Sequence, residues 1–290
     1  MKLLIPPIKI QGKKTKLVEW ILSFIPQDYR ENKIYVEPFV GSGVVGFNFN
    51  PKRAIFSDIN PYIIRFYQDL KEDVITPDEI KLFLISEGEK LRKWGEEYYY
   101  EVRDRFNKHP NSLDFLFLNR ASFNGVIRFN RQGRFNVPFC KKADRFSKSY
   151  ITKIYNQVSW LYVRIKENDW TFLNKDFREV LKEVDENYFV YLDPPYIARH
   201  SDYYNSWNEK DEKDLFEIIK RSRFLFILSS WYKNNYRENN FIKLYEKLDG
   251  IAILTKEHFY LVRGRKENSV DEAIITNIAD VSVERTILRR

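Results

Sequence analysis

The sequence predicts an α/β protein with a mixed, mostly parallel sheet, and three features carry that prediction. Short apolar runs of strand length alternate with longer segments in which apolar residues recur at helical spacing. The run at 188–192 stops at Asp193-Pro194-Pro195-Tyr196, and because proline cannot continue a central strand, the sheet must end there. Apolar runs at 252–254, 259–262 and 272–277 indicate a closing hairpin, which would make the sheet mixed.

The remaining elements follow from the same criteria. We expect strands at 34–36, 53–57, 171–173 and 224–229, and helices within 17–25, 62–107, 149–165 and 209–222. The charged helical stretch after residue 70 interrupts the alternation of strands and helices. We therefore expect residues 1–70 and 166–290 to form one domain, with 71–165 as a mostly helical insertion that carries a β-hairpin.

Composition narrows the class of protein. Its 290 residues suffice for a sizeable core, and 17% aromatic residues oppose disorder. The net charge of +8 favours an anionic partner, although a merely basic protein is equally compatible with it. The single cysteine, Cys140, excludes an intramolecular disulfide, and no apolar run reaches the roughly 20 residues that span a membrane. We expect a cytoplasmic protein with no membrane segment, and no metal site, because the three histidines are scattered.

A glycine-rich loop follows the first expected strand. Gly41, Gly43 and Gly46 match the dinucleotide fingerprint, which would suggest an NAD-dependent oxidoreductase or merely a tight turn. Here, however, Glu37-Pro38-Phe39 separates the strand from the glycines, whereas a pyrophosphate needs the strand to lead directly into them. A carboxylate at that place suits a cationic ammonium better. S-adenosylmethionine carries both an ammonium and a sulfonium, so it fits this loop.

Other strand ends carry groups that suit a nucleoside cofactor. Asp58, with Ile59 beside it, could accept both hydroxyls of a ribose, or it could cap a helix before Pro61. Asp176 and Phe177 would meet the adenine, although a simple helix start at Asp176 is about as probable on sequence grounds. The loop that holds Ile10 and Lys14 could bind the carboxylate end of the cofactor, or form a solvated arm.

The positive charge is concentrated between residues 120 and 148. This segment has eight arginines and lysines against one acid, Asp144, and phenylalanines and asparagines are interleaved with them. That composition is typical of a nucleic-acid surface, and the alternative is a solvated basic loop. Asn130–Gly133, between 126–129 and 134–137, predicts a hairpin turn. A hairpin of this kind can enter a major groove.

The residues after the fourth expected strand suit methylation of an exocyclic amino group. N–H groups of such an amine would donate to Asp193 and to the carbonyl of Pro194, which leaves the nitrogen lone pair directed at a methyl donor. Proline suits this position because it has no N–H of its own and fixes φ. Pro195 completes the rigid turn, and Tyr196 would stack on the base. Such a base must leave the duplex. Cytosine C5 methylation is disfavoured, because it needs a cysteine nucleophile and Cys140 lies in the basic segment.

These motifs together resemble the DNA adenine methylase (Dam) family of N6-adenine methyltransferases. The match covers the Lys9/Gly12/Lys14 loop, 37–43, Asp58, 119–139 and 193–196, in the order of the family. The resemblance implies a Rossmann-like, S-adenosylmethionine-dependent methyltransferase fold. Two departures are Ile10, where the family often has Trp, and Lys13, where it often has a second Gly.

From the residues and the resemblance together we expect a catalytic set and two binding sets. The catalytic set is Asp193, Pro194, Pro195 and Tyr196. The cofactor set is Ile10, Lys14, Glu37, Pro38, Phe39, Gly41, Ser42, Gly43, Asp58, Ile59, Asp176, Phe177 and Asp193. The DNA set is Arg120, Phe123, Asn124, Val126, Arg128, Asn130, Arg134, Asn136, Pro138 and Lys141, with Arg128 as the expected reader of guanine.

The resemblance also implies partners, and alternatives stay open. Double-stranded DNA is the expected substrate, with GATC a guess for the site, a cognate restriction endonuclease as a partner, and a monomer or weak dimer as the assembly. The motif at 193–196 also serves cytosine-N4 methyltransferases, and a catalytically silent DNA-binding protein on this scaffold is a further alternative. The loop 197–207, rich in Tyr, Ser and Asn, could close over a base.

Overall fold

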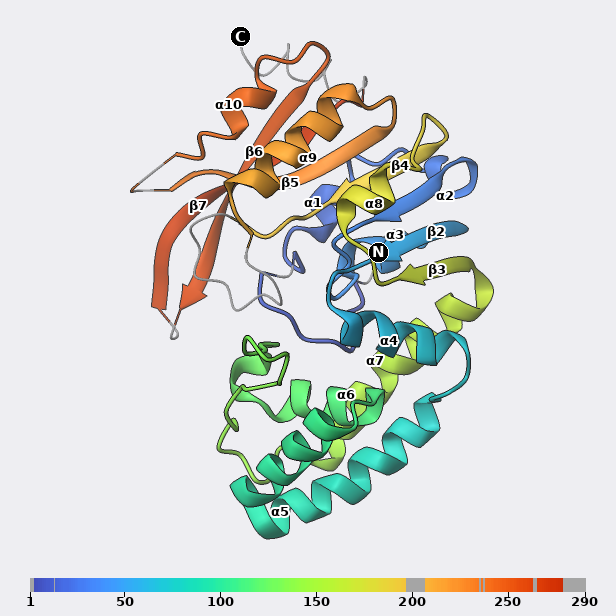
Figure 1. Ribbon diagram of the computed structural model, residues 1–290, viewed down its shortest axis with the longest axis vertical. Helices are drawn as coiled ribbons and strands as arrows, with labels where there is room; N and C mark the ends of the chain where they lie inside the picture. The colour runs from blue at the N-terminus through green and yellow to red at the C-terminus, as the bar shows by residue number, and fades with distance from the viewer. Residues whose placement is uncertain are drawn as a thin grey trace.

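The structure is a computed structural model that describes residues 3–12, 14–196, 207–234, 236, 238–262 and 265–278, with the backbone alone at 234, 258–262 and 265–269. The loop at 197–206 and Lys13 lie outside the described residues. The described chain forms a seven-stranded sheet with helices on both faces, and a helical body lies beyond one edge of that sheet (Figure 1).

The sheet has the order β3-β2-β1-β4-β5-β7-β6, in which the first five strands are parallel and β7 is antiparallel to both β5 and β6. This confirms the predicted mixed, mostly parallel sheet. The strands are β1 (Ile34–Glu37), β2 (Arg53–Ser57), β3 (Asp169–Leu173), β4 (Tyr188–Leu192), β5 (Leu225–Asn234), β6 (Ala252–Val262) and β7 (Arg265–Thr276). The two apolar runs expected at 252–254 and 259–262 are one continuous strand, β6.

The strand order reverses between β1 and β4. From β1 the chain moves outward to β2 and β3, and it then returns to place β4 on the other side of β1. In sheets of this kind, the carboxyl ends of the strands on either side of such a reversal form a crevice that binds ligands. Glu37 is the last residue of β1 and Asp193 follows the last residue of β4, so both lie at this crevice.

Alternate residues of the central strands supply the two faces of the core. On one face, Val36 and Val190 pack with α8 (Phe177–Leu181), α9 (Glu209–Arg221) and α10 (Ile242–Tyr245). On the other face, Tyr35 and Phe189 pack with α1 (Val18–Leu22), α3 (Val44–Phe49) and α4 (Pro61–Lys71). The period of two along each strand therefore accounts for the layers. The helix α2 (Tyr29–Asn32) leads into β1.

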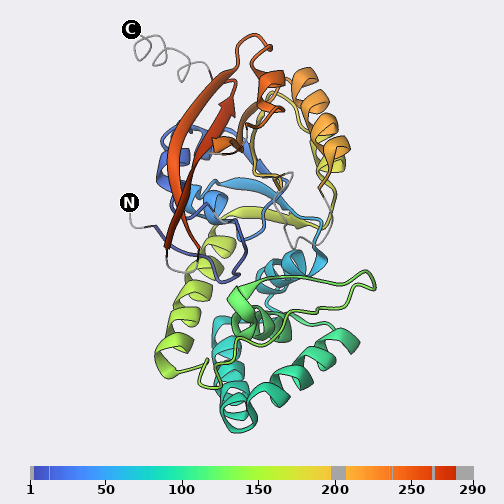
Figure 2. The same ribbon diagram turned by 90° about the vertical axis from the view of Figure 1, so that its left-hand side faces the viewer.

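The helical body consists of α5 (Pro77–Lys108), α6 (Ser112–Ala121), the 3-10 turn η1 (Phe123–Gly125) and α7 (Lys148–Glu167), which leads back to β3 (Figure 2). The helical stretch expected at 62–107 contains α4 and α5, and the second begins where Thr76 forms a capping box with Glu79 ahead of Pro77. Gly95 has φ +60° and breaks the helical path within α5. The domain boundaries at residues 70 and 166 stay a prediction.

The hairpin turn predicted at 130–133 is confirmed, but the segments on either side of it are too short to form named strands. A single antiparallel bridge joins Phe129 and Phe135, and Asn130 N–H donates to the carbonyl of Arg134 at 2.9 Å. Asn107 of α5 binds the backbone of this segment: its side chain accepts from the N–H of Phe135 and donates to the carbonyl of Phe135. Among the described residues, no helix has the length and apolar composition to cross a membrane.

Trp170 on β3 offers a test of the core. Its ring is fully buried, stacks on Phe47 at 5.4 Å, and donates from Nε1 to the carbonyl of Pro51 at 2.7 Å. We expect Trp170→Ala to lower the free energy of unfolding by roughly 3–5 kcal/mol, because it leaves a cavity and an unpaired carbonyl. Urea denaturation measures this. The control Trp94→Ala, at a half-exposed ring, should cost less than about 1 kcal/mol; equal costs would contradict the packing described.

Candidate active site

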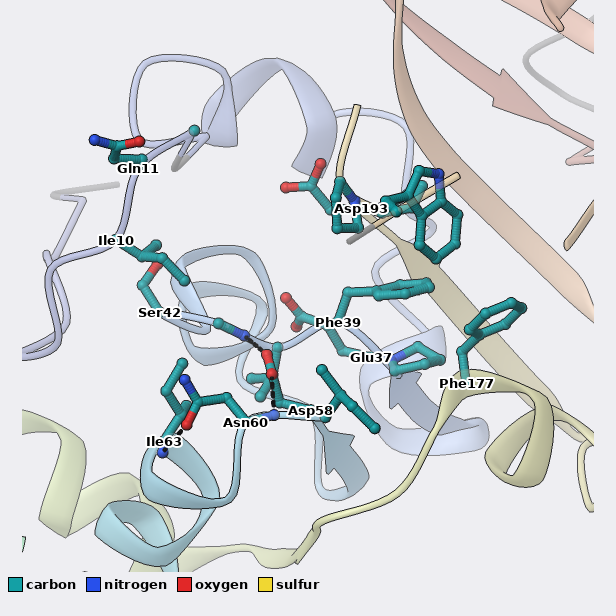
Figure 3. Close-up of a pocket in the computed structure, with 18 of the residues that line it drawn as sticks. Ile10, Gln11, Glu37, Phe39, Ser42, Asp58, Asn60, Ile63, Phe177 and Asp193 are labelled. Carbon is teal, nitrogen blue, oxygen red and sulfur yellow. Dashed lines mark hydrogen bonds between the residues drawn. The ribbon is translucent and has the colours of Figure 1, made fainter. Parts of the chain in front are cut away.

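A cavity of about 370 Å³ opens at the carboxyl edge of the sheet, at the reversal between β1 and β4 (Figure 3). Every predicted catalytic residue lines it, and so does every predicted cofactor residue except Gly43. The N-terminal loop, the ends of β1 to β4 and the start of α9 contribute to its wall. The structure thus brings these groups together, while their contacts with a cofactor stay a prediction.

The loop after β1 owes its path to two of its glycines. Gly43 has φ +67°, and a Cβ there would lie 2.2 Å from the ring of Phe47. A Cβ on Gly46 would lie 2.4 Å from Glu37 Oε2. Glycine at 46 therefore lets α3 approach β1 this closely, and glycine at 43 leaves room for the ring of Phe47.

Glu37 is buried at the end of β1. Its Oε2 accepts from Tyr35 Oη at 2.9 Å and from Gly46 N–H at 3.1 Å. Burial raises the pKa of this carboxyl well above its usual range, although both hydrogen bonds oppose the rise. A positive charge brought into the cavity would favour the ionised form.

Asp58 follows β2, and its two oxygens are fixed by backbone N–H groups. Gly41 N–H donates to Oδ2 and Asn60 N–H to Oδ1, both at 2.9 Å, as the dashed lines in Figure 3 show. Burial nevertheless raises the pKa of Asp58 to about 6. The alternative that Asp58 caps the next helix is wrong, because Asn60 is the N-cap of α4.

Asp193 belongs to a cluster of side chains from three parts of the chain. Lys14 Nζ lies 3.0 Å from Asp193 Oδ1 and donates to Tyr196 Oη at 2.6 Å. Tyr196 in turn donates to Glu272 Oε2 at 3.0 Å. Burial raises the pKa of Asp193, and Lys14 opposes that rise while Glu272 adds to it. Lys14 is 4% exposed, so the alternative of a solvated arm is wrong for this residue.

Three aromatic rings form one wall of the cavity. Phe39 and Phe177 lie 5.3 Å apart, and Trp207 lies 5.5 Å from the first and 5.4 Å from the second. Asp176 caps α8 by accepting from Arg178 N–H, which confirms the helix-start alternative. Trp207 was not singled out as a site residue, although it ends the loop 197–207 that was expected to close over a base.

The predicted DNA residues fall into three groups. Phe123, Asn124, Arg134, Pro138 and Lys141 are exposed; Asn130, Arg128 and Asn136 are half-buried; and Arg120 and Val126 are buried. Arg128 Nε donates to Asn136 Oδ1 at 2.9 Å, so these two side chains meet each other. Val126 lines the cavity rather than the outer surface.

Arg120 requires a correction. Its guanidinium is 2% exposed and donates to Gln157 Oε1 and to Tyr150 Oη, both on α7. It joins α6 to α7 and is not presented to DNA. Composition alone suggested DNA contact, because a count of basic residues does not distinguish buried from exposed ones.

This placement gives a prediction. We expect Arg120→Met to lower the melting temperature, because Gln157 and Tyr150 lose a buried partner. It should leave the slope of log K against log salt for DNA binding unchanged, since no phosphate contact is lost. Arg134→Ala, at an exposed arginine, should reduce that slope by about 1. Fluorescence anisotropy with a duplex at several salt concentrations checks both, and a reduced slope for Arg120→Met would restore a DNA role.

No group of three or more potential metal ligands occurs within the described ranges. The sheet order, the glycine loop and the Asp-Pro-Pro-Tyr turn at the end of β4 agree with the methyltransferase class that the sequence motifs indicated. The comparisons with known proteins are more specific. Residues 11–273 match the model of the D12 class N6 adenine-specific DNA methyltransferases.

Several relatives extend over much of the chain. The Type II methyltransferase M.MjaIII of Methanocaldococcus jannaschii is 31% identical, covering 94% of this chain and 98% of that protein. A DNA adenine methylase of Vibrio cholerae is 34% identical over 65% of this chain and 64% of that protein. The modification methylase StsI of Streptococcus sanguinis is 27% identical over 93% of this chain and 42% of that protein. A solved putative rRNA-methylase from Clostridium thermocellum has a TM-score of 0.41 at 8% identity, covering 93% of this chain and all of that one.

The chain belongs to the D12 class of N6 adenine-specific DNA methyltransferases. It is therefore an adenine-specific DNA methyltransferase, as the sequence motifs indicated.

Proposed function

We propose that the protein transfers a methyl group from S-adenosylmethionine to N6 of an adenine in double-stranded DNA, in one in-line step on a base turned out of the duplex. The observation that carries the proposal is the position of Asp193-Pro194-Pro195-Tyr196. This turn follows β4 and shares one cavity with Glu37 at the end of β1 and Asp58 after β2. An acceptor of amino protons and a site for a nucleoside thus face each other.

The residues present fit the cofactor. Asp58 would accept the ribose hydroxyls, and Phe177 and Ile59 would flank the adenine. Glu37 and Phe39 would line the methionine end, and Lys14 and Asp193 would contact it. Carboxylates dominate the charge of this part of the cavity, which suits a ligand with a sulfonium and an ammonium. When bound, S-adenosylmethionine supplies a methyl group on positively charged sulfur.

The protein's own part in the reaction is to bind and orient the amine. Asp193 and the carbonyl of Pro194 accept the two N–H bonds of N6, and this favours a pyramidal nitrogen whose lone pair faces the methyl group. Tyr196 stacks on the base, and the hydrogen bond from Lys14 Nζ to its buried hydroxyl fixes the ring. Positioning of this kind supplies most of the rate enhancement.

The exposed part of the basic segment would hold the DNA. Phe123 is 54% exposed beside Asn124, and Arg134 and Lys141 lie on the surface of the same segment. Phosphate contacts from such cations give affinity, while side chains such as Arg128 that reach base edges give specificity. Because several relatives are named Type II methyltransferases, we include a cognate restriction endonuclease as a partner in this proposal.

The direct test is incubation of the purified protein with unmethylated plasmid DNA and S-adenosylmethionine labelled in its methyl group. Mass spectrometry of the digested DNA identifies the modified base, and sequencing locates it. N6-methyladenine at one short motif is the expected result. Label on N4 of cytosine would replace this proposal with the alternative reaction, and label on neither base would overturn it.

Loss of the Asp193 carboxylate tests the catalytic role. We expect Asp193→Ala to slow single-turnover methylation by roughly 100- to 1000-fold, because one acceptor of the N6 protons is lost. The matched control is Asp185→Ala, at an exposed aspartate in the turn before the same strand, which should retain full activity. Methylation by Asp193→Ala at the rate of the unaltered protein would contradict the mechanism.

The pKa of Asp58 gives a prediction about pH. Ribose hydroxyls donate to the ionised carboxylate, and the pKa of Asp58 is about 6, so affinity for S-adenosylmethionine should fall as the pH drops through 6. Calorimetric titration between pH 5 and pH 8 measures this. Asp58→Asn should bind more weakly at pH 8 and show little of the change near pH 6. The same pH dependence in Asp58→Asn would assign the effect to another group.

A further inference from the structure

Glu272 is a buried carboxylate for which the reaction as proposed above gives no role. It lies on β7, where it is paired with Trp231 of β5 and Lys256 of β6 in the antiparallel part of the sheet. It is 1% exposed. Removing a carboxylate from water costs several kcal/mol unless partners compensate, so its contacts indicate why it is tolerated there.

Those contacts are with the candidate active site. Glu272 Oε2 accepts from Tyr196 Oη at 3.0 Å and lies 3.8 Å from Lys14 Nζ. Lys14 also contacts Asp193 Oδ1 at 3.0 Å and donates to Tyr196 at 2.6 Å. One ammonium is thus shared between two carboxylates, and the tyrosine hydroxyl bridges the ammonium and the second carboxylate.

This geometry constrains both ends of the Asp193-Pro194-Pro195-Tyr196 turn. Without Glu272, the hydroxyl of Tyr196 would lose one of its partners, and of the two carboxylates only Asp193 would attract Lys14. Asp193 would then form a simple ion pair with a full positive charge, which competes with an amine for the same oxygen. With Glu272 present, Lys14 is attracted to two carboxylates, so its ammonium is not paired with Asp193 alone.

We propose that Glu272 is a positioning residue for methyl transfer, which holds Lys14 and Tyr196 so that Asp193 can accept the target N–H and the Tyr196 ring meets the base. The inference rests on the proposed function, because it assigns a role to a residue outside the turn in that same reaction. It differs from a purely structural role for the ion pair, in which Glu272 would contribute only to stability.

The test compares Glu272→Gln with the unaltered protein. Glutamine keeps an acceptor for the Tyr196 hydroxyl but removes the charge. We expect single-turnover methylation under saturating cofactor to slow by roughly 10- to 100-fold, because the reacting groups lose their alignment. The dissociation constant for S-adenosylmethionine, measured separately, should change less than the rate does.

The pH profile separates positioning from stability. Among the described residues, the groups that face Asp193 are Lys14 from the N-terminal loop, Glu272 from β7, Tyr35 and Glu37 from β1, Tyr191 from β4, and Tyr196. Methyl transfer needs the ionised carboxylate, so the rate falls as the pH drops through the pKa of Asp193. The negative charge of Glu272 raises the pKa of Asp193. In Glu272→Gln, the acidic limb of the pH–rate profile should therefore move to lower pH.

A matched control is Asp114→Asn. Asp114 is also 1% exposed and ion-paired, with Arg105 Nε donating to it at 2.9 Å, but it lies in the helical body away from the cavity. Asp114→Asn should lower the melting temperature and leave the acidic limb of the pH–rate profile at the same pH as in the unaltered protein. If Glu272→Gln behaves like this control, with the rate and the acidic limb unchanged, the inference is wrong.

Tyr196→Phe provides a second route should Glu272→Gln not fold. It keeps the ring but removes the hydroxyl that Glu272 holds, and we expect a similar loss of rate with cofactor binding retained. An unchanged rate would overturn the inference. Failure of the proposed function is distinguishable, because the unaltered protein would then give no N6-methyladenine, whereas failure of this inference leaves its activity intact.

Discussion

The structure of the active-site region depends on how one edge of the sheet holds three carboxyl groups that are buried from water. Glu37 ends β1, Asp58 follows β2 and Asp193 follows β4, and these three strands lie side by side and parallel. Burial raises the pKa of each carboxyl group. Backbone N–H groups and a tyrosine hydroxyl bind the first two, and Lys14 pairs with the third. These partners leave more carboxyl groups than ammonium groups around the cavity, which suits the cationic methyl donor proposed above. A dinucleotide pyrophosphate would add negative charge to the same place, so the glycine fingerprint by itself is misleading here.

Much of the fold could be predicted because it is encoded locally. β2 and β4 have the predicted bounds, since each is a short apolar run that ends at a polar residue or a proline. The glycines and the strand-end acids could also be assigned, because parallel strands must place their carboxyl ends at one edge. Element boundaries were harder: the start of α5 at Thr76 and Pro77 was not placed, and the expected hairpin has only one antiparallel bridge.

Contacts that depend on distant pairing could not be predicted. Glu272 reaches Tyr196 because β7 runs antiparallel beside β5, which places a residue close to the C-terminus next to the turn after β4. Trp207 meets Phe39 because α9 begins at the cavity. Arg120 was assigned to DNA for the same reason: its neighbours in sequence are basic, while its neighbours in space, Gln157 and Tyr150, bind it inside. Sequence patterns report periodicity and composition, and neither says which side chain is covered by another element.

The side-chain amide of Asn119 is one of the contacts that join the helical body to the N-terminal loop at the cavity. Asn119 of α6 accepts from Lys9 N–H at 2.8 Å and donates to the carbonyls of Lys9 and Gly125. It thereby fixes η1, which presents Phe123 and Asn124, to the N-terminal loop that carries Lys14 to Asp193. This contact places the exposed segment that we propose holds DNA beside the N-terminal segment whose Lys14 side chain pairs with Asp193.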